Sequence, residues 1–391
     1  MSNIPVVQIL PFSRRTQLSI TLAYNFVFVV LGLAAVSFGP TLPGLAEQTQ
    51  SNLSQISYLF TARAVGGLLG SFGFGRLYDR LPGHTLMALL LSTMTVMLLL
   101  TPLVPALWLL SLILLVLGVA EGGMHVGGNT LIVWIYGGRV GPVMTGMHFF
   151  FGVGALLSPI IVAQIMLITG TIRWPYWILA VIILPAVVWL SRLPSPSLPT
   201  SSAGPVVRPI NRRLVILFTL FFFLYVGTEI SMSGWIFTYT LTVGLGQAAT
   251  AAYLASAFWG AITLTRLVAI PAAAHLRPRT ILLFDLIGAL ISAGIIQAWS
   301  GSLAAIWVGT LGLGLSLGSV FPTTMSLAGR RMAITGSITG LFLVGSSLGA
   351  MLLPWLIGQL FEPVGPQTLL LTIITALLLA GGVLPGLLRF P

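Results

Sequence analysis

Long apolar segments recur along the whole chain, and short polar or basic turns separate them. A helix needs about 20 predominantly apolar residues to cross the hydrocarbon core of a bilayer. The pattern therefore predicts an all-α membrane protein whose helices cross the bilayer repeatedly. Twelve segments reach the required length, at residues 17–41, 55–78, 84–104, 106–136, 141–169, 174–192, 213–243, 249–274, 279–299, 302–328, 334–361 and 367–388.

The placement of arginine supports this count. All 17 basic residues are arginine, and with both termini in the cytoplasm fourteen of them fall in inner segments. One, Arg173, falls in an outer loop, and two, Arg63 and Arg266, fall inside helices. Because cytoplasmic loops of membrane proteins carry an excess of cations, we expect a multi-pass protein of the plasma (inner) membrane with both termini in the cytoplasm.

The composition excludes several classes of protein. Only 6% of the residues are charged and 57% are hydrophobic, whereas soluble domains carry roughly 25% charged residues. The net charge of +11 follows from membrane topology, so we expect the lipid bilayer and no nucleic acid as a partner. The chain has no cysteine, and its four histidines show no paired metal-ligand spacing. Without a recognisable nucleophile–base pair or metal set, we predict no catalytic residues, no metal site and no enzyme activity.

The two halves of the chain resemble each other. Residues 193–211 form a linker rich in Pro and Ser, and a shift of 195 residues aligns the segments on either side without a gap. Five identities then fall within eleven positions, where Gly154, Ala155, Leu157, Pro159 and Gln164 face Gly349, Ala350, Leu352, Pro354 and Gln359. We predict two pseudo-symmetric six-helix bundles, residues 1–192 and 212–391, joined by the cytoplasmic linker 193–211. Transporters built from such repeats bind their solute near the midplane, between the two repeats.

The fourth predicted helix carries a polar stripe. Glu121, His125 and Asn129 follow each other at intervals of four residues and so share one face of the helix. His148 on the next helix falls at a similar depth. Ionisable side chains are costly in hydrocarbon, so we predict that this stripe carries function. The alternative is that these groups only bind one another between packed helices.

The seventh helix supplies a second carboxylate, Glu229, followed by Trp235 and Tyr239. Aromatic rings beside amide and carboxylate groups suit a sugar, whose C–H faces stack while its hydroxyls both donate and accept hydrogen bonds. The alternative for a Trp or Tyr is an anchor at the membrane interface. Further polar or aromatic residues that could complete the site are Asn25, Gln164, Tyr253, Trp259, Trp355 and Gln359.

The two cations within helices need partners. Arg63 and Arg266 could each neutralise Glu121 or Glu229, or reach Asp285, and the sequence leaves these pairings open. A glutamate that pairs permanently with an arginine stays ionised and is a poor carrier of protons.

The turn after the second helix holds Asp79 and Arg80. Residues 75–84 resemble the Gly-x-x-x-Asp-Arg-x-Gly-Arg-Arg loop of the major facilitator superfamily, with one extra residue and a histidine in place of the first arginine of the closing pair. The resemblance implies that Asp79 and Arg80 help to close the cytoplasmic side, since a carboxylate is favoured at a helix N-terminus. The alternative is a basic turn that only sets topology.

Longer motifs narrow the resemblance. Gly-Gly-Asn at 127–129, followed by residues 144–155, is similar to the sodium-dependent glucose transporter 1 branch of the major facilitators, which is related to the fucose–proton symporters. Segments of the first, seventh, eighth and eleventh helices fit the same branch, at 37–43, 224–229 with 235–239, 258–260 with 266, and 348–355. The resemblance implies a sugar substrate, taken up by alternating access and coupled to a cation.

One departure from the branch bears on the cation. The family pattern Asp-Thr-Gly-Gly-Asn reads His-Val-Gly-Gly-Asn at 125–129, so one carboxylate is missing. Sodium prefers oxygen ligands, whereas a histidine, whose usual pKa is about 6.5, could titrate during transport, which favours proton coupling with Na⁺ as the alternative. Glu121, one turn earlier, could supply the missing charge.

Together these observations predict a monomeric importer of a hexose-like sugar, with Glu121 or Glu229 carrying the coupling ion and with no cofactor besides that cation. An exporter of drugs or amphiphilic lipids and an uncoupled sugar uniporter are the alternatives. The predicted sugar contacts are Asn25, His125, Asn129, His148, Gln164, Trp235, Tyr239, Trp259, Trp355 and Gln359.

Overall fold

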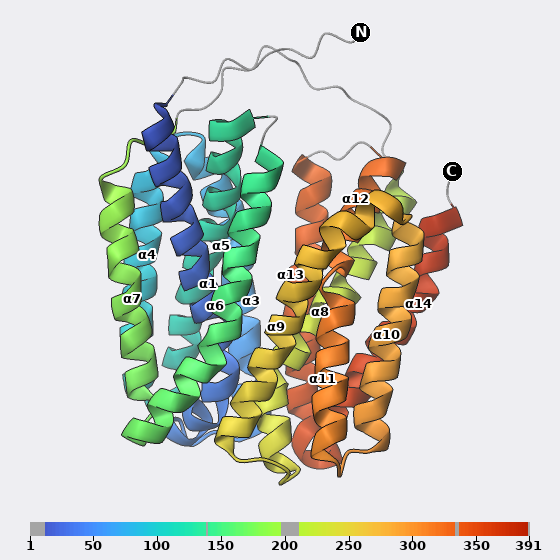
Figure 1. The fold of residues 1–391 in the computed structure, drawn as a ribbon. Helices are drawn as coiled ribbons and strands as arrows, with labels where there is room; N and C mark the ends of the chain where they lie inside the picture. Colours follow the sequence, from blue (N-terminus) through green and yellow to red (C-terminus); the bar gives the residue numbers. More distant parts are fainter. Residues whose placement is uncertain (1–11, 138–139, 197–210, 333–335, 390–391) are drawn as a thin grey trace.

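The computed structural model describes residues 12–137, 140–196, 211–332 and 336–389, and helix is the regular secondary structure of this part of the chain (Figure 1). The first half contains α1 (Arg14–Gln48), α2 (Leu53–Ile56), α3 (Tyr58–Tyr78), α4 (Gly83–Leu100), the 3₁₀ turn η1 (Thr101–Leu103), α5 (Leu107–Tyr136), α6 (Val140–Thr169) and α7 (Arg173–Ser191). The second half contains α8 (Arg212–Thr242), α9 (Ala248–His275), α10 (Pro278–Ala298), α11 (Leu303–Leu317), α12 (Val320–Arg331), α13 (Gly336–Val364) and α14 (Thr368–Arg389).

Most of these helices are suited to span a membrane. Among the described residues, 11 helical stretches are long and apolar enough, with α11 and α12 together forming one of them. The further long helix, α3, has 21 residues and is less apolar because it carries Arg63 and Arg76. The all-α membrane fold predicted from the sequence is thereby confirmed.

Two helices differ from their predicted extents. α1 runs to Gln48, beyond the predicted end at 41, with Pro40 and Pro43 inside it. The predicted helix 302–328 is divided at Gly318 and Ser319 into α11 and α12. Pro322 explains this division, since proline has no N–H to donate to the carbonyl four residues earlier and its ring displaces that carbonyl.

The helices form two groups that lie side by side, α1 to α7 and α8 to α14 (Figure 1). Equivalent helices make equivalent contacts in the two groups. Gly154 of α6 packs so closely on α1 that a Cβ atom would lie 2.0 Å from the carbonyl oxygen of Val29. Gly349 of α13, at the position 195 residues later, packs on α8 with the same 2.0 Å spacing to the carbonyl oxygen of Phe223. Small residues permit such backbone approach between membrane helices.

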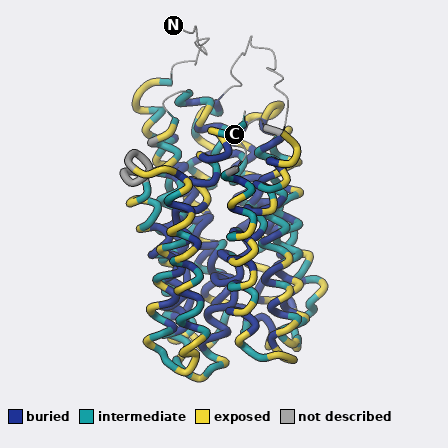
Figure 2. The backbone as a smooth tube through the Cα atoms, turned by 90° about the vertical axis from the view of Figure 1, so that its right-hand side faces the viewer, coloured by how far each residue is buried: buried dark blue, intermediate teal, exposed yellow. Residues whose placement is uncertain are grey.

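The distribution of buried residues matches the arrangement of the helices in two groups. Buried positions line the facing sides of the helices, and exposed positions lie on the outside and at the ends (Figure 2). Large apolar side chains on the outside are suited to lipid contact. Between the groups, α6 packs on α9, α3 on α13 and α1 on α8. Most of the predicted linker lies outside the described residues, so the domain boundaries at 192 and 212 stay a prediction.

Candidate functional site

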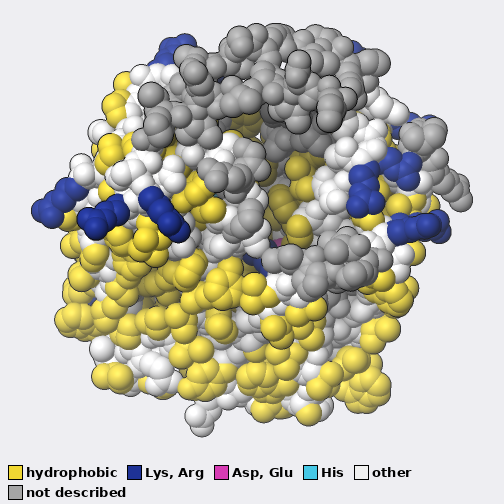
Figure 3. Space-filling model, turned by 45° about the horizontal axis from the view of Figure 1, so that its top comes forward, with side chains coloured by type: hydrophobic (Ala, Val, Ile, Leu, Met, Phe, Trp, Pro, Cys, Tyr) yellow, Lys and Arg dark blue, Asp and Glu magenta, His cyan; other side chains and the backbone are white. Residues whose placement is uncertain are grey.

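One end of the molecule is hollowed between the two groups of helices. This is the end at which α1 begins and α14 ends (Figure 1). In the view onto it, apolar side chains line a central hollow, and Arg or Lys atoms and Asp or Glu atoms show at its depth (Figure 3). We call this hollow the central cavity.

The first charged group between the helices is an ion pair between α3 and α5. Arg63 Nε donates to Glu121 Oε2 at 2.8 Å, and Arg63 Nη2 to Glu121 Oε1 at 2.5 Å. The same guanidinium donates to the backbone carbonyl oxygens of Ala34 at 3.1 Å and Ala35 at 3.2 Å in α1. Arg63 therefore ties three helices together, and both carboxylate oxygens of Glu121 are occupied. Such a bidentate pair fixes geometry as well as charge.

The predicted polar residues of α5 and α6 do meet. His148 Nε2 lies 3.2 Å from Asn129 Oδ1, and Asn129 Nδ2 donates to the backbone carbonyl oxygen of His125 at 2.8 Å. Phe28 of α1 lies edge-on to both histidines, with ring centroids 5.8 Å from His125 and 5.5 Å from His148. The sequence analysis did not include Phe28, because one phenylalanine among 21 in an apolar chain carries no signal of its own.

Aromatic rings connect this cluster with the second group of helices. Phe151 of α6 lies 5.6 Å from His125 and 6.1 Å from Trp259 of α9, measured between ring centroids. Trp259 Nε1 donates to Ser233 Oγ of α8 at 2.8 Å. Polar and aromatic side chains from both groups are thus in contact between the halves, with Trp259 itself 3% exposed, and we call this set of side chains the His–Trp surface.

The second carboxylate, Glu229 of α8, has a looser ion pair. Glu229 Oε1 lies 3.9 Å from Arg266 Nη2 of α9, and the hydroxyl of Tyr225 donates to Glu229 Oε2. The structure therefore pairs Arg63 with Glu121 and Arg266 with Glu229, which the sequence left open. The Arg266 pair is longer and single, so less energy is needed to separate it than the bidentate pair.

At the opposite end of the molecule, hydrogen bonds close the space between the groups. Ser54 Oγ donates to Gln359 Oε1 at 2.7 Å, and Gln359 Nε2 donates to the carbonyl oxygen of Ser54 at 2.9 Å and to Ser57 Oγ at 3.1 Å. The backbone N–H of Leu53, at the start of α2, donates to Glu362 Oε1 of α13 at 2.9 Å. The contacts of Ser54, Ser57 and Glu362 could not be predicted from the sequence, since a short polar turn does not reveal a partner about three hundred residues away.

The other predicted glutamine also reaches across to the opposite group of helices. Gln164 of α6 donates from Nε2 to the hydroxyl of Tyr253 of α9 at 2.9 Å. Gln164 and Gln359 are 195 residues apart, as are Tyr58 and Tyr253 at the starts of α3 and α9. Each glutamine thus reaches the start of the equivalent helix in the opposite group. We call Gln164, Gln359 and these partners the glutamine latch.

Beneath the latch lies a stack of aromatic rings. Trp235 lies between Phe60 and Phe361, with centroids 5.9 Å and 5.2 Å away, and donates from Nε1 to the carbonyl oxygen of Pro354 at 3.0 Å. Trp235 is 0% exposed and Tyr239 is 1% exposed. In this conformation Trp235 forms part of the seal, and Tyr239 is buried, so neither predicted sugar contact is open to the cavity.

The remaining predicted residues are less well supported by contacts. Asn25 Oδ1 and Trp355 Nε1 are buried and have no hydrogen-bond partner among the described residues. Trp355 lies 6.1 Å from Tyr58, on the side of the latch. Asp79 and Arg80 are exposed after α3, and neither forms an ion pair within the part of the chain that the structure describes.

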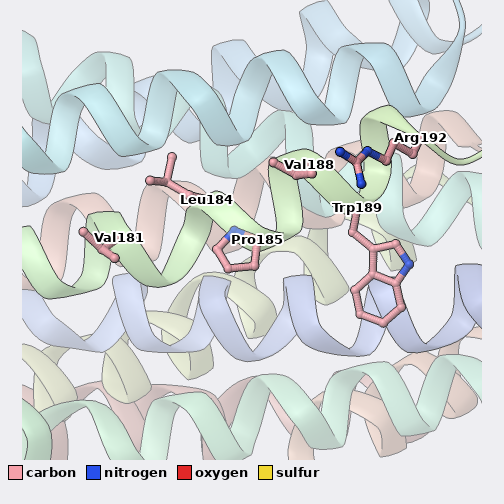
Figure 4. Close-up of a pocket in the computed structure, with 6 residues that line it drawn as sticks. All are labelled: Val181, Leu184, Pro185, Val188, Trp189 and Arg192. Carbon is pink, nitrogen blue, oxygen red and sulfur yellow. The ribbon is translucent and has the colours of Figure 1, made fainter.

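A further groove lies away from this site, on the outer face of α7 (Figure 4). Its wall includes Val181, Leu184 and Val188, whose exposed fractions are 60%, 47% and 47%, and Arg192 stands at one end. Exposed aliphatic side chains on a spanning helix are suited to lipid, so we exclude this groove from the site.

Comparison with known proteins gives consistent matches. Residues 24–354 match the model of the Major Facilitator Superfamily. The sodium-dependent glucose transporter 1 of Danio rerio is 33% identical, over 91% of this chain and 67% of its own length. The sodium-dependent glucose transporter 1A of Mus musculus is 31% identical, over 85% of this chain and 87% of its own length. The crystal structure of a mutant of the nucleoside transporter NupG matches with a TM-score of 0.77 and 12% identity, covering 96% of this chain and 100% of that one, which shows a shared fold.

Proposed function

Because this chain belongs to the Major Facilitator Superfamily, we propose that it is a secondary transporter that imports a hexose-like sugar by alternating access. The observation that carries the proposal is the His–Trp surface. Its imidazoles and amide offer donors and acceptors, and its rings offer faces for C–H stacking. The relatives named as glucose transporters support the same class of substrate.

The sugar would bind between His125, Asn129 and His148 on one side and Trp259 on the other. In the structure His148 Nε2 lies 3.2 Å from Asn129 Oδ1. A sugar hydroxyl both donates and accepts, so it can insert between them without leaving either one unpaired. Solute binding at the boundary between repeats lets the two groups move about a fixed site.

Orientation follows from the arginines. We place the protein in the plasma (inner) membrane with both chain termini in the cytoplasm. The central cavity then opens toward the cytoplasm, and the glutamine latch closes the outer side. The conformation is then the one from which sugar leaves toward the cytoplasm. One chain supplies both walls of the cavity, which supports a monomer as the working unit.

We propose that sugar uptake is coupled to H⁺, with Na⁺ as the alternative cation. Of the two glutamates beside the cavity, Glu229 is better suited to respond to a cation, because its contact with Arg266 is single and 3.9 Å long. The bidentate Arg63–Glu121 pair is better suited to hold α1, α3 and α5 together.

A binding screen tests the substrate class before transport is measured. The purified protein is heated with a panel of hexoses, nucleosides and amphiphilic drugs, since a ligand that binds only the folded state raises the melting temperature. We expect stabilisation by at least one hexose, and less of it in Asn129→Ala. Stabilisation by amphiphiles alone would favour the exporter and would contradict the proposal.

A further inference from the structure

A third carboxylate lies within the spans, away from the central cavity. Of the described acidic side chains in the long helices, Glu121 and Glu229 are paired with arginines, whereas Asp285 of α10 forms no ion pair. Its hydrogen-bond partner among the described residues is neutral, because Ser319 Oγ donates to Asp285 Oδ2 at 2.6 Å. An ionisable residue within a membrane is costly and marks an ion pathway or a proton relay more often than a scaffold.

The hydrogen-bond partner of Asp285, Ser319, lies where the neighbouring membrane span is divided into α11 and α12. Ser319 lies in the two-residue interruption between α11 and α12, and it is 3% exposed. Pro322 leaves the carbonyl oxygen of Gly318 without its usual helical donor. A carboxylate, a hydroxyl and a freed carbonyl are thus carried by adjoining segments of α10 and of the interruption. Discontinuous helices in transporters supply oxygen ligands of this kind to coupling ions.

The interruption is in contact with the helix that carries Arg266. Thr265 of α9 donates from Oγ1 to the carbonyl oxygen of Leu315 at 2.8 Å. Gly318 approaches α9 so closely that a Cβ atom would lie 2.6 Å from the carbonyl oxygen of Ile262. Arg266 follows Thr265 directly and faces Glu229. A structural change at Ser319 can therefore be transmitted to Arg266 and Glu229 through the packing of the interruption on α9. Transport measurements on variants can test this coupling.

The charges around Asp285 are few. The helices packed on α10 are α11, α12 and α14. Their charged residues are Arg330 and Arg331 in the last turn of α12 and Arg389 at the end of α14, and α10 itself begins near Arg279. No described cation lies within ion-pair distance of Asp285. The carboxylate is therefore available to bind a small cation.

We infer that Asp285 and Ser319 form a binding site for the monovalent cation, a proton or Na⁺, that drives transport. Binding of the cation neutralises the carboxylate to which Ser319 donates, rearranges the contact between α10 and the interruption, and shifts α9 with Arg266 against Glu229. This inference rests on the proposed cation-coupled sugar uptake. It assigns the ion site to Asp285 and Ser319 rather than to Glu121 or Glu229, and Glu229 responds to the ion through α9 and Arg266.

Sugar exchange in proteoliposomes tests the inference. Labelled sugar enters vesicles that hold unlabelled sugar, while pH and Na⁺ are varied equally on both sides, so exchange needs no gradient. The variants are Asp285→Asn, Ser319→Ala and, as a matched serine control on α10, Ser292→Ala, whose hydroxyl donates to the carbonyl oxygen of Gly288 in its own helix.

We expect wild-type exchange to depend on pH or on Na⁺, and Asp285→Asn to exchange sugar at a rate independent of both. Ser319→Ala should shift the half-maximal cation concentration by about tenfold, the worth of a hydrogen bond to a charged group. Ser292→Ala should behave as the wild type. A response to pH alone identifies the proton, and a response to Na⁺ alone identifies sodium.

Two results would overturn the inference. One is a cation response that survives unchanged in Asp285→Asn, or in Ser319→Ala if the first variant does not fold. The other is wild-type exchange that responds to neither cation. Failure of the proposed sugar function is distinguishable from both, because the wild type would then exchange none of the sugars at any pH or Na⁺ concentration.

Discussion

The glutamine latch gives the most direct test of how the two groups move. The side chain of Gln359 makes three hydrogen bonds of the latch, two with Ser54 and one with Ser57. These bonds can form only while the end of the molecule opposite the termini is closed. Substituting Gln359→Ala removes all three without adding a charge or a bulky group. The closed state is then destabilised relative to the state in which this end is open.

The size of the effect follows from the contacts. Each hydrogen bond between neutral groups contributes about 0.5 to 1 kcal/mol in this partly buried setting, so the three together contribute about 2 kcal/mol. A difference of about 2 kcal/mol changes the ratio of open to closed molecules about 30-fold. Gln164→Ala removes one bond, to Tyr253, and should change the ratio only about threefold.

The assay uses the absence of cysteine from the natural chain. A single cysteine introduced by Ser233→Cys lies at the boundary of the two groups, where the carbonyl oxygen of residue 233 is 2.8 Å from a Cβ built on Gly39. A membrane-impermeant maleimide is then added from the outer side of intact cells. We expect Gln359→Ala to raise the labelling rate in proportion to the open population.

Gln367→Ala is the matched control, because Gln367 bonds only to Val364 within its own turn among the described residues. It should leave the labelling rate unchanged. If Gln359→Ala labels no faster than this control, the latch does not hold the outer side closed and the reasoning from hydrogen bonds is wrong.

Two further predictions concern the central cavity. Glu121→Gln leaves the charge of Arg63 unpaired, so we expect a loss of stability of about 3 kcal/mol, measured by unfolding in detergent, with partial recovery when Arg63→Gln is added. An Arg63–Glu121 pair that matters only for transport would leave unfolding unchanged. Asn129→Ala removes the amide next to His148 and should weaken sugar binding about tenfold at unchanged melting temperature, measured by calorimetry. Undiminished affinity would place the sugar elsewhere.

Much of the fold could be predicted because the bilayer restricts what a sequence can do. We predict the membrane-spanning helices from the lengths of the apolar segments and from the loops in which arginine lies. The family match and the observed helices confirm a transport protein with a major facilitator fold. The repeat offset of 195 residues also correctly predicts that Gly154 and Gly349 make equivalent helix contacts. These features depend on local composition or on strict repetition, which a single sequence records.

The site could be predicted only in part, because partners depend on how helices are rotated and on which conformation is present. The stripe on α5 correctly predicts that Asn129 and His148 lie together. It could not assign Glu121 to Arg63, since either arginine satisfies the same need for a countercharge. Gln359 and Trp235 are predicted sugar contacts, and in the structure Gln359 bonds to Ser54 and Trp235 stacks on Phe60 across the closed end of the molecule.

Sugar uptake into proteoliposomes tests whether the protein imports a hexose against its gradient by coupling to a cation. Vesicles are loaded at equal sugar concentration inside and outside, and a proton gradient or a sodium gradient is imposed, acid or sodium-rich on the side that corresponds to the outside of the cell. We expect the labelled hexose to accumulate above equilibrium and an ionophore for the coupling ion to abolish the accumulation. A hexose that only equilibrates, whatever gradient is imposed, would contradict cation-coupled import.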